Sequence, residues 1–173
     1  MSRYEEIKNL LRTQKDGKGI IKGDVLMNKK FSPTIWVVSV GKGYKEELSE
    51  CEESDGWSVP SKSRINDLIL FYHNLPDSCI KDIFKITGDV HKELAGEWTV
   101  KKCDFFAPIE RVARIHSPIT FREMKSNEYL SGSQMILMCM NGRFEVTEYW
   151  DRLYAMILKK NPSLKKALSQ YHS

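Results

Sequence analysis

A continuous apolar, aromatic-rich run at residues 68–72 is the feature that most constrains the fold of this chain. Apolar runs of this length between polar segments predict buried strands. Shortly before it, Trp57 lies in the segment Gly56–Pro60, whose glycine, serine and proline are typical of a turn. A tryptophan in a turn beside a buried strand can form the wall of a pocket. This stretch therefore predicts recognition of a flat molecule.

Other segments predict short strands with helices between them. Strands are predicted at residues 34–40, 80–88 and 109–115. Helices are predicted at residues 45–53, 120–124 and 148–159. Thr120, with Glu123 three residues later, and Thr147 are the expected N-caps, while the apolar run 135–140 fits either a core strand or a buried helix. About five or six short strands with few helices predict an α+β fold whose strands close into a small barrel.

The length of 173 residues suits one well-cored domain and is short for two. We expect a helical extension over residues 1–30, a folded domain over residues 31–160 and a basic tail over residues 161–173. The net charge of +4 comes from the ends, because residues 31–158 hold 15 basic and 19 acidic groups. Residues 159–173 carry four lysines and no acid. Bulk charge therefore argues only weakly for a nucleic-acid partner, although a local basic rim is compatible with it.

The sequence lacks the marks of membrane insertion and of secretion. No apolar run approaches the length of a membrane span, and the N-terminus has no apolar core of a signal peptide. The four cysteines are far apart and form no C-x-x-C pair, which excludes a zinc knuckle and a thioredoxin-like site. We expect a cytoplasmic protein with free thiols and no membrane partner.

Motifs for catalysis and for cofactor binding are also missing from the sequence. The histidines lie outside any nucleophile motif, and Ser133 lacks the following glycine of a nucleophile elbow. Segment 41–46 contains two glycines but matches neither a Walker loop nor a dinucleotide loop, so it is interpreted as a tight turn. A solvated helix face is the interpretation of Glu46, Glu47, Glu50, Glu52 and Glu53. We therefore expect no catalytic residue, no cofactor and no metal.

Several motifs, in order, resemble those of EVE domains, which belong to the PUA-like superfamily and are related to YTH domains. The segment Trp57-Ser58-Val59-Pro60, followed by Asp67-Leu68-Ile69-Leu70-Phe71-Tyr72, is similar to the W-G-[VI]-P and G-D-x-[LV]-[VLI]-F-Y motifs of that family. The flanking segments agree in order, from the strand with Trp36 to the helix start at Glu148-Tyr149-Trp150. The resemblance spans about residues 34–158. Asn66 departs from it by replacing the usual glycine.

This resemblance implies a PUA-like small mixed β-barrel, flanked by helices, that binds DNA or RNA carrying a modified base, such as a methylated adenine or cytosine. Trp57 would wall an aromatic pocket, and the Ser58 backbone would contact the base edge. The expected base-binding pocket comprises Ser39, Val40, Gly41, Trp57, Ser58, Val59, Pro60, Tyr72, His73 and Trp98, of which Trp98 is chosen for its loop position alone. Phosphate contacts are expected from Lys42, Gly43, Lys62 and Arg64.

Nucleic-acid binding is the favoured function, because stacking on aromatic rings contributes about 1–3 kcal/mol per base. The resemblance to EVE domains is also compatible with a fused or associated nuclease or NTPase subunit as a partner. Two alternatives stay open. One is an enzyme acting on a small nucleotide or modified base, with His73 or a cysteine as catalyst. The other is a protein-interaction module whose basic ends bind an acidic partner through Lys159, Lys160, Lys165 and Lys166.

Overall fold

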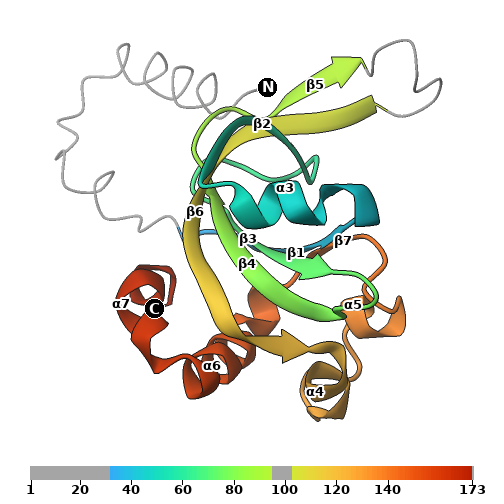
Figure 1. Cartoon of the computed structure of the whole chain (residues 1–173), viewed down its shortest axis with the longest axis vertical. Coiled ribbons are helices and arrows are strands. Elements are labelled where there is room, and N and C mark those ends of the chain that lie inside the picture. The colour runs from blue at the N-terminus through green and yellow to red at the C-terminus, as the bar shows by residue number, and fades with distance from the viewer. Residues whose placement is uncertain (1–31, 95–102, 173) are drawn as a thin grey trace, which may run out of the picture. The chain divides into compact units, whose positions relative to one another are not determined.

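The computed structural model of the chain describes residues 32–94 and 103–172. The described fold belongs to the unit Ser32–Ser173. Figure 1 shows a strongly curled sheet with helices on both of its sides. The α+β class that the sequence predicts is confirmed.

The sheet has seven strands, in the order β2-β6-β4-β3-β1-β7, with β5 paired to β6. Their bounds are β1 Ile35–Val40, β2 Glu53–Val59, β3 Leu68–His73, β4 Cys79–Ile86, β5 His91–Leu94, β6 Cys103–Thr120 and β7 Arg143–Glu145. The pairing of β1 with β3 is parallel, and the other pairings are antiparallel. β6 is longer than the predicted strand and continues through Pro118. Its pairing with β4 shifts register between Ile80 and Asp82, so the β6 residues between Arg114 and Ile119, Pro118 among them, form a bulge.

Strand β3 is the predicted apolar run, and all six of its residues are buried. Its side chains alternate between two hydrophobic clusters. Leu68 and Leu70 belong to the cluster that includes residues of the C-terminal helices, whereas Ile69 and Phe71 belong to the cluster inside the curl. Because successive strand residues point to opposite faces, only a strand covered on both faces needs an unbroken apolar run. The sequence pattern thus reflects the central place of β3.

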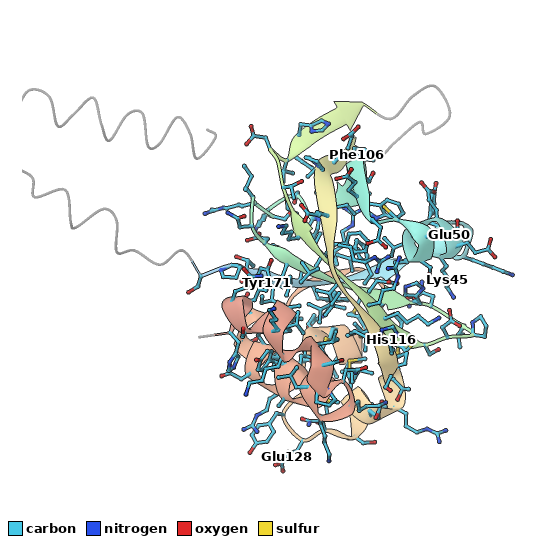
Figure 2. The ribbon with its side chains drawn as sticks, turned by 60° about the vertical axis from the view of Figure 1, so that its left-hand side comes forward. Lys45, Glu50, Phe106, His116, Glu128 and Tyr171 are labelled. Carbon is cyan, nitrogen blue, oxygen red and sulfur yellow. The ribbon has the colours of Figure 1, made fainter. Side chains whose placement is uncertain are left out.

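Helices cover both faces of the sheet (Figures 1 and 2). α3 (Lys45–Glu50) packs on the inner cluster through Leu48. The outer cluster includes residues of α4 (Phe121–Ser126), α5 (Gln134–Leu137), α6 (Trp150–Lys160) and α7 (Lys165–Leu168). Short 3-10 turns occur at η1 (Lys42–Tyr44), η2 (Thr147–Tyr149), η3 (Pro162–Leu164) and η4 (Ser169–Tyr171).

The helix ends test the predicted caps. Thr120 caps α4 in a complete capping box with Glu123, as predicted. Thr147 is not the N-cap of α6: its hydroxyl accepts a hydrogen bond from the Ile35 backbone N–H at 3.1 Å, and α6 begins at Trp150 after a 3-10 turn. Within the expected basic tail, residues 162–171 form short helical turns, and Leu168 of α7 is fully buried in the outer cluster.

The departure at Asn66 from the EVE pattern has a structural explanation. Asn66 has a φ of 71°, a left-handed conformation that asparagine adopts more readily than most residues and that glycine adopts freely. The next residue, Asp67, is buried and accepts hydrogen bonds from the Thr34 N–H at 3.0 Å, the Trp36 indole at 3.1 Å and the Arg64 N–H at 2.8 Å. The Asn-Asp pair therefore fixes the start of β3 against β1.

The two outer strands of the sheet, β2 and β7, are joined by one side chain. Arg143 of β7 donates to the Val59 carbonyl of β2 at 2.7 Å and also to the Ser58 hydroxyl. This bridge connects the ends of the curled strand order without backbone pairing between β2 and β7. The expected barrel is thus a curled half-barrel, and Arg143 lies where its edges meet.

Candidate functional site

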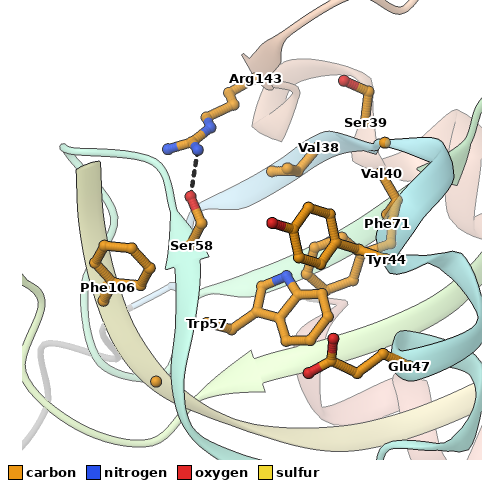
Figure 3. Close-up of a pocket in the computed structure, with 12 residues that line it drawn as sticks. Val38, Ser39, Val40, Tyr44, Glu47, Trp57, Ser58, Phe71, Phe106 and Arg143 are labelled. Carbon is orange, nitrogen blue, oxygen red and sulfur yellow. Dashed lines mark hydrogen bonds between the residues drawn. The ribbon is translucent and has the colours of Figure 1, made fainter. Parts of the chain in front are cut away.

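A cavity of about 390 Å³ opens between the end of β1, the turn η1 with α3, and the edge strand β2 (Figure 3). Its walls combine apolar, aromatic, hydroxyl and charged side chains. The lining residues are Val38, Ser39, Val40, Gly41, Tyr44, Glu47, Gly56, Trp57, Ser58, Phe71, Phe106 and Arg143. Five of these lining residues, Ser39, Val40, Gly41, Trp57 and Ser58, are among those that the sequence predicts for the pocket.

Trp57 is half-buried and has an aromatic neighbour on either side. Its ring centroid lies 6.4 Å from that of Tyr44 and 6.2 Å from that of Phe71, with interplanar angles of 79° and 73°. Phe71 is fully buried, whereas Tyr44 is 62% exposed. The Trp57 ring therefore has a fixed aromatic neighbour in the core and a movable one at the surface.

The position of Trp57 corrects the prediction that it lies in a turn. It belongs to β2 and pairs with Ala107 of β6, just after a register shift that begins at Ser54. A bulge on an edge strand tolerates glycine and small polar residues as a turn does, and it re-aims the side chains that follow. The glycine, serine and proline of the segment Gly56–Pro60 were therefore compatible with a turn and with a bulged edge strand.

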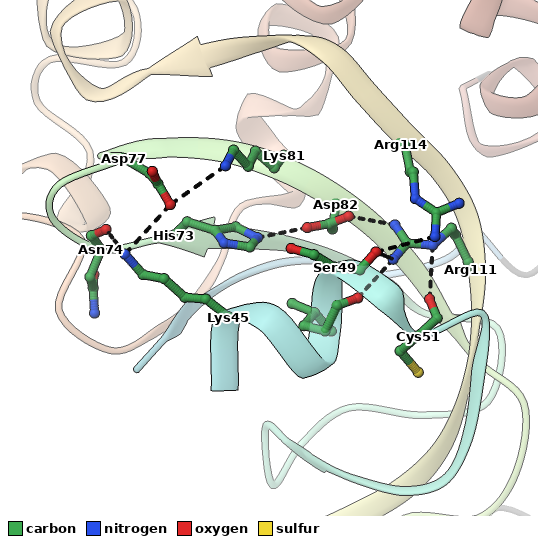
Figure 4. Close-up of polar contacts among 11 residues, drawn as sticks. Lys45, Ser49, Cys51, His73, Asn74, Asp77, Lys81, Asp82, Arg111 and Arg114 are labelled. Atoms are coloured by element: carbon green, nitrogen blue, oxygen red, sulfur yellow. Dashed lines mark hydrogen bonds and ion pairs between the residues drawn. The ribbon is translucent and has the colours of Figure 1, made fainter. Parts of the chain in front are cut away.

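Tyr44 and Glu47 reach the cavity because α3 is held at both ends by polar contacts (Figure 4). At its start, Lys45 Nζ donates to the Asn74 carbonyl and, at 2.9 Å, to the Leu75 carbonyl. At its end, buried Arg111 donates to the carbonyls of Leu48 at 2.8 Å, Ser49 at 3.3 Å and Cys51 at 2.9 Å. A short helix has little stability of its own, so these contacts fix its orientation.

His73, an expected pocket residue, lies in this polar network and not at the cavity. Its Nε2 is 2.6 Å from Asp82 Oδ2, and the side chain is 1% exposed. Asp82 also accepts a hydrogen bond from Arg111. His73 shares the inner face of β3 with Phe71 but is completely buried, so a ligand in the cavity does not reach it.

The Asp82 contacts give the protein an acid-sensitive element. Burial by itself would raise the pKa of Asp82, but the hydrogen bonds from His73 and Arg111 outweigh it and hold the pKa below its ordinary value. The resulting stabilisation is complete at pH values above 3.8, the ordinary pKa of aspartate. It is lost as the pH falls through the lowered pKa of Asp82. We expect the free energy of unfolding in urea to fall less steeply from pH 5 to pH 2 in Asp82→Asn than in the wild type. Parallel curves would contradict this role.

The other expected pocket residues divide into several positions. Tyr72 belongs to the outer cluster, because its place in β3 turns it to the face opposite Phe71. Val59 is buried in the inner cluster, and Trp98 lies outside the described residues. Lys42 and Gly43 are exposed on η1, beside the cavity. The exposed Lys62 and Arg64 lie on the segment between β2 and β3.

A second depression of about 310 Å³ adjoins the first through Arg143. Its lining residues are Trp36, Pro60, Ser61, Lys62, Phe105 and Arg143. Pro60 and Lys62 thus belong to this neighbouring surface. Arg143 separates the two depressions, with some of its guanidinium N–H groups used by Val59 and Ser58.

Seven lining residues were not among the predicted pocket residues: Val38, Tyr44, Glu47, Gly56, Phe71, Phe106 and Arg143. Glu47 was interpreted as part of a solvated helix face. Tyr44, directly after two closely spaced glycines, offered a weak signal. Arg143 carried no local signal at all, because it meets Val59 from 84 residues away.

Residues 32–94 and 103–172 contain no group of three His, Cys, Asp or Glu side chains placed to hold a metal ion. Within the same ranges, no helix has the length and apolar character needed to cross a membrane.

Known structures share this fold at low sequence identity. A hypothetical protein from Leishmania major has 15% identity and a TM-score of 0.61 over 75% of this chain and 97% of its own. A protein from Pseudomonas putida has 17% identity and a TM-score of 0.58 over 72% and 99%. An ASCH protein from Zymomonas mobilis has 11% identity and a TM-score of 0.52 over 70% and 94%.

These similarities confirm the predicted PUA-like fold. No family model matches the sequence, and no curated protein matches it. The resemblance to EVE domains in particular therefore stays a prediction, while the wider similarity to ASCH and PUA-like structures holds at the level of the fold.

Proposed function

We propose that the protein binds DNA or RNA and takes one modified base of the strand into the cavity beside Trp57. The observation that carries this proposal is the cavity itself, which combines a half-buried indole, an exposed tyrosine and an arginine at one mouth. Aromatic rings hold bases by stacking, and guanidinium groups bind phosphate. Both kinds of group border one hollow large enough for a planar heterocycle.

Entry of the base requires a movement of Tyr44. The Tyr44 and Trp57 rings stand nearly perpendicular, at 79°, so they do not form a parallel-sided slot. The 3-10 turn that carries Tyr44 has no buried residue, which makes reorientation of its ring inexpensive. In the proposed complex the base stacks on Trp57, and Tyr44 turns to cover its other face. Phe71 and the β-sheet behind it stay in place.

The strand would cross a rim of exposed basic residues. Lys42 lies on one side of the cavity, and Lys62 and Arg64 follow the edge strand β2. Arg143 lies between the cavity and the second depression. A nucleotide flanking the captured base would place its phosphate at this arginine. We propose that the protein acts by binding alone, with a fused or associated nuclease or NTPase subunit acting on the captured strand.

Direct binding measurements test the proposal. Single-stranded and duplex DNA and RNA of identical sequence, with one methylated or one unmodified base, are titrated into the full chain while fluorescence anisotropy is recorded. We expect tighter binding of a strand with a modified base. Equal affinity for every modified and unmodified pair would remove modified-base recognition, and no binding to any strand would remove the nucleic-acid function.

The basic rim makes a separate prediction. Alanine at Lys42, Lys62 and Arg64 together should weaken binding to modified and unmodified strands alike, because phosphate contacts carry no sequence information. The dependence of log Kd on log salt should become shallower by about one for each lost contact. Alanine at Lys125 and Lys159, which are exposed on α4 and α6, is the matched control. An unchanged salt dependence in the triple variant would contradict the assigned phosphate contacts.

A further inference from the structure

The second depression, next to the cavity, plays no part in the proposed capture of the modified base. It has a volume of about 310 Å³ and shares Arg143 with the cavity. The described residues that line it are apolar, hydroxyl-bearing or cationic, and none is a carboxylate: Trp36, Pro60, Ser61, Lys62, Phe105 and Arg143. Apolar rings beside two cations suit a ligand that is flat in one part and anionic in another.

One buried carboxylate fixes two walls of this depression. Asp67 is 4% exposed and accepts hydrogen bonds from the Trp36 indole N–H at 3.1 Å and from the Arg64 backbone N–H at 2.8 Å. The Pro60 carbonyl accepts a hydrogen bond from the Ser63 N–H at 3.0 Å, so the turn between β2 and β3 is held at both of its ends. A ligand that enters a depression with fixed walls binds with little ordering cost.

Phe105 is the aromatic side chain of the depression that offers a ligand the larger contact. It is half-buried, whereas Trp36 is 7% exposed. Phe105 belongs to β6 and packs against the inner cluster, so its ring is supported from behind. A base can stack on such a ring whatever its identity, because every base has a π-face.

The charges around the cavity indicate the side on which a strand leaves the captured base. Figure 3 shows Arg143 and Glu47 on opposite sides of the Trp57 ring. Exposed acidic residues continue from Glu47 along α3 and into β2, with Glu50 and Glu53 among them. A phosphate next to the captured base is attracted to the arginine and repelled by the acidic residues. The nucleotide beyond that phosphate then lies at the second depression.

A third depression, of about 260 Å³, also includes Arg143 but suits a nucleotide less well. Its lining residues include Glu145 and Glu148, and both are exposed. These carboxylates would repel a phosphate. The second depression is therefore the better site for a neighbouring nucleotide.

We infer that the second depression binds the nucleotide next to the modified base, with its base against Phe105 and the linking phosphate at Arg143 and Lys62. This inference rests on the proposed function and extends the ligand from one base to a dinucleotide step. The neighbour on the other side of the modified base has no such site, because the strand there leaves the two cations. A base therefore contributes to affinity on one side of the modified base and not on the other.

Abasic nucleotides, which keep the sugar and the phosphate but lack the base, provide the test. The methylated strand that the wild type binds most tightly is prepared in two further forms, with an abasic nucleotide directly before or directly after the methylated base. Fluorescence anisotropy measures the Kd of each strand. We expect one abasic strand to bind about fivefold to a hundredfold more weakly than the intact strand, the range for one base stacked on an aromatic ring. The other abasic strand should bind nearly as tightly as the intact one.

Phe105→Leu tests whether the depression causes this asymmetry. Leucine keeps apolar packing on the inner cluster but removes the aromatic ring. The intact strand should therefore bind more weakly than to the wild type, whereas the sensitive abasic strand, which has no base to stack, should bind as before. The difference between these two strands should shrink. Phe121→Leu is the matched control and should keep the wild-type difference, because Phe121 is also half-buried but packs on the outer cluster.

The outcomes separate this inference from the proposed function. Equal binding of the two abasic strands, or an unchanged difference in Phe105→Leu, would overturn the inference, while a retained preference for the methylated strand would leave base capture at Trp57 intact. Loss of that preference in the wild type, or no binding to any strand, would overturn both. Circular dichroism and thermal unfolding verify that each variant is folded.

Discussion

Trp57→Ala should weaken binding to a strand with the preferred modified base by about tenfold to a hundredfold. The reason is the loss of stacking, which contributes about 1–3 kcal/mol for each base on an aromatic ring. The same change should affect an unmodified strand less, because that strand is held mainly by phosphate contacts. Fluorescence anisotropy with both strands at one fixed salt concentration measures the two losses.

Two further variants separate a binding effect from a folding effect. Trp57 packs against the inner cluster, so its removal also lowers stability. Tyr44→Ala removes the other wall at a position that is 62% exposed, and it should weaken binding with little change in the unfolding temperature. Tyr129→Ala is the control, since Tyr129 is 52% exposed and lies under Arg152 on another part of the surface. Full affinity in both Trp57→Ala and Tyr44→Ala would refute the base pocket.

Arg111→Met should produce the largest loss of stability, about 3–5 kcal/mol, because it leaves a buried carboxylate without its charged partner. The Arg111 side chain is 5% exposed and binds Asp82, the carbonyls at the end of α3, and the face of Phe84 at 4.6 Å. Urea unfolding at pH 7 measures the loss. Since α3 carries Tyr44 and Glu47, the surviving folded fraction should also bind nucleic acid more weakly.

Arg114 provides a matched control on the same strand. It pairs with Glu52 and donates to the Ser49 carbonyl, as Arg111 does, but its side chain is 44% exposed. Arg114→Met should therefore cost about 1 kcal/mol or less. Adding Asp82→Leu to Arg111→Met should restore part of the stability, because the orphaned charge is removed. Equal losses of stability in Arg111→Met and Arg114→Met would show that burial of the Arg111–Asp82 contacts contributes nothing to the free energy of unfolding.

Local sequence patterns were sufficient for much of the fold. The apolar run of β3, the capping box of Thr120 and the amphipathic face of α6 each depend on residues within a few positions of one another. The motif order then led to the PUA-like fold. Errors arose where one local pattern was compatible with two structures. Thr147 could cap α6 but accepts a hydrogen bond from β1 instead, and Gly56 could mark a turn but lies at a bulge.

The candidate site was predictable only in part. Trp57, Ser58 and the end of β1 were expected at the cavity and lie there. His73, the last residue of β3, was also expected there, yet it lies in the buried network with Asp82. The sequence does not show that Lys45 and Arg111 hold α3 over this part of the sheet. Glu47 is exposed, as the predicted solvated helix face requires, but the sequence does not show that it also lines the cavity.

The sequence by itself determined several of the strands and helices, among them the buried strand β3, the capped helix α4 and the amphipathic helix α6, because periodicity and capping are local properties of the chain. The tertiary structure alone decided which polar and aromatic side chains share a cavity. Arg143 meets Ser58 across 85 positions of sequence, and Arg111 meets Leu48 across 63. Contacts of this kind depend on the curl and register of the whole sheet, so no single segment encodes them.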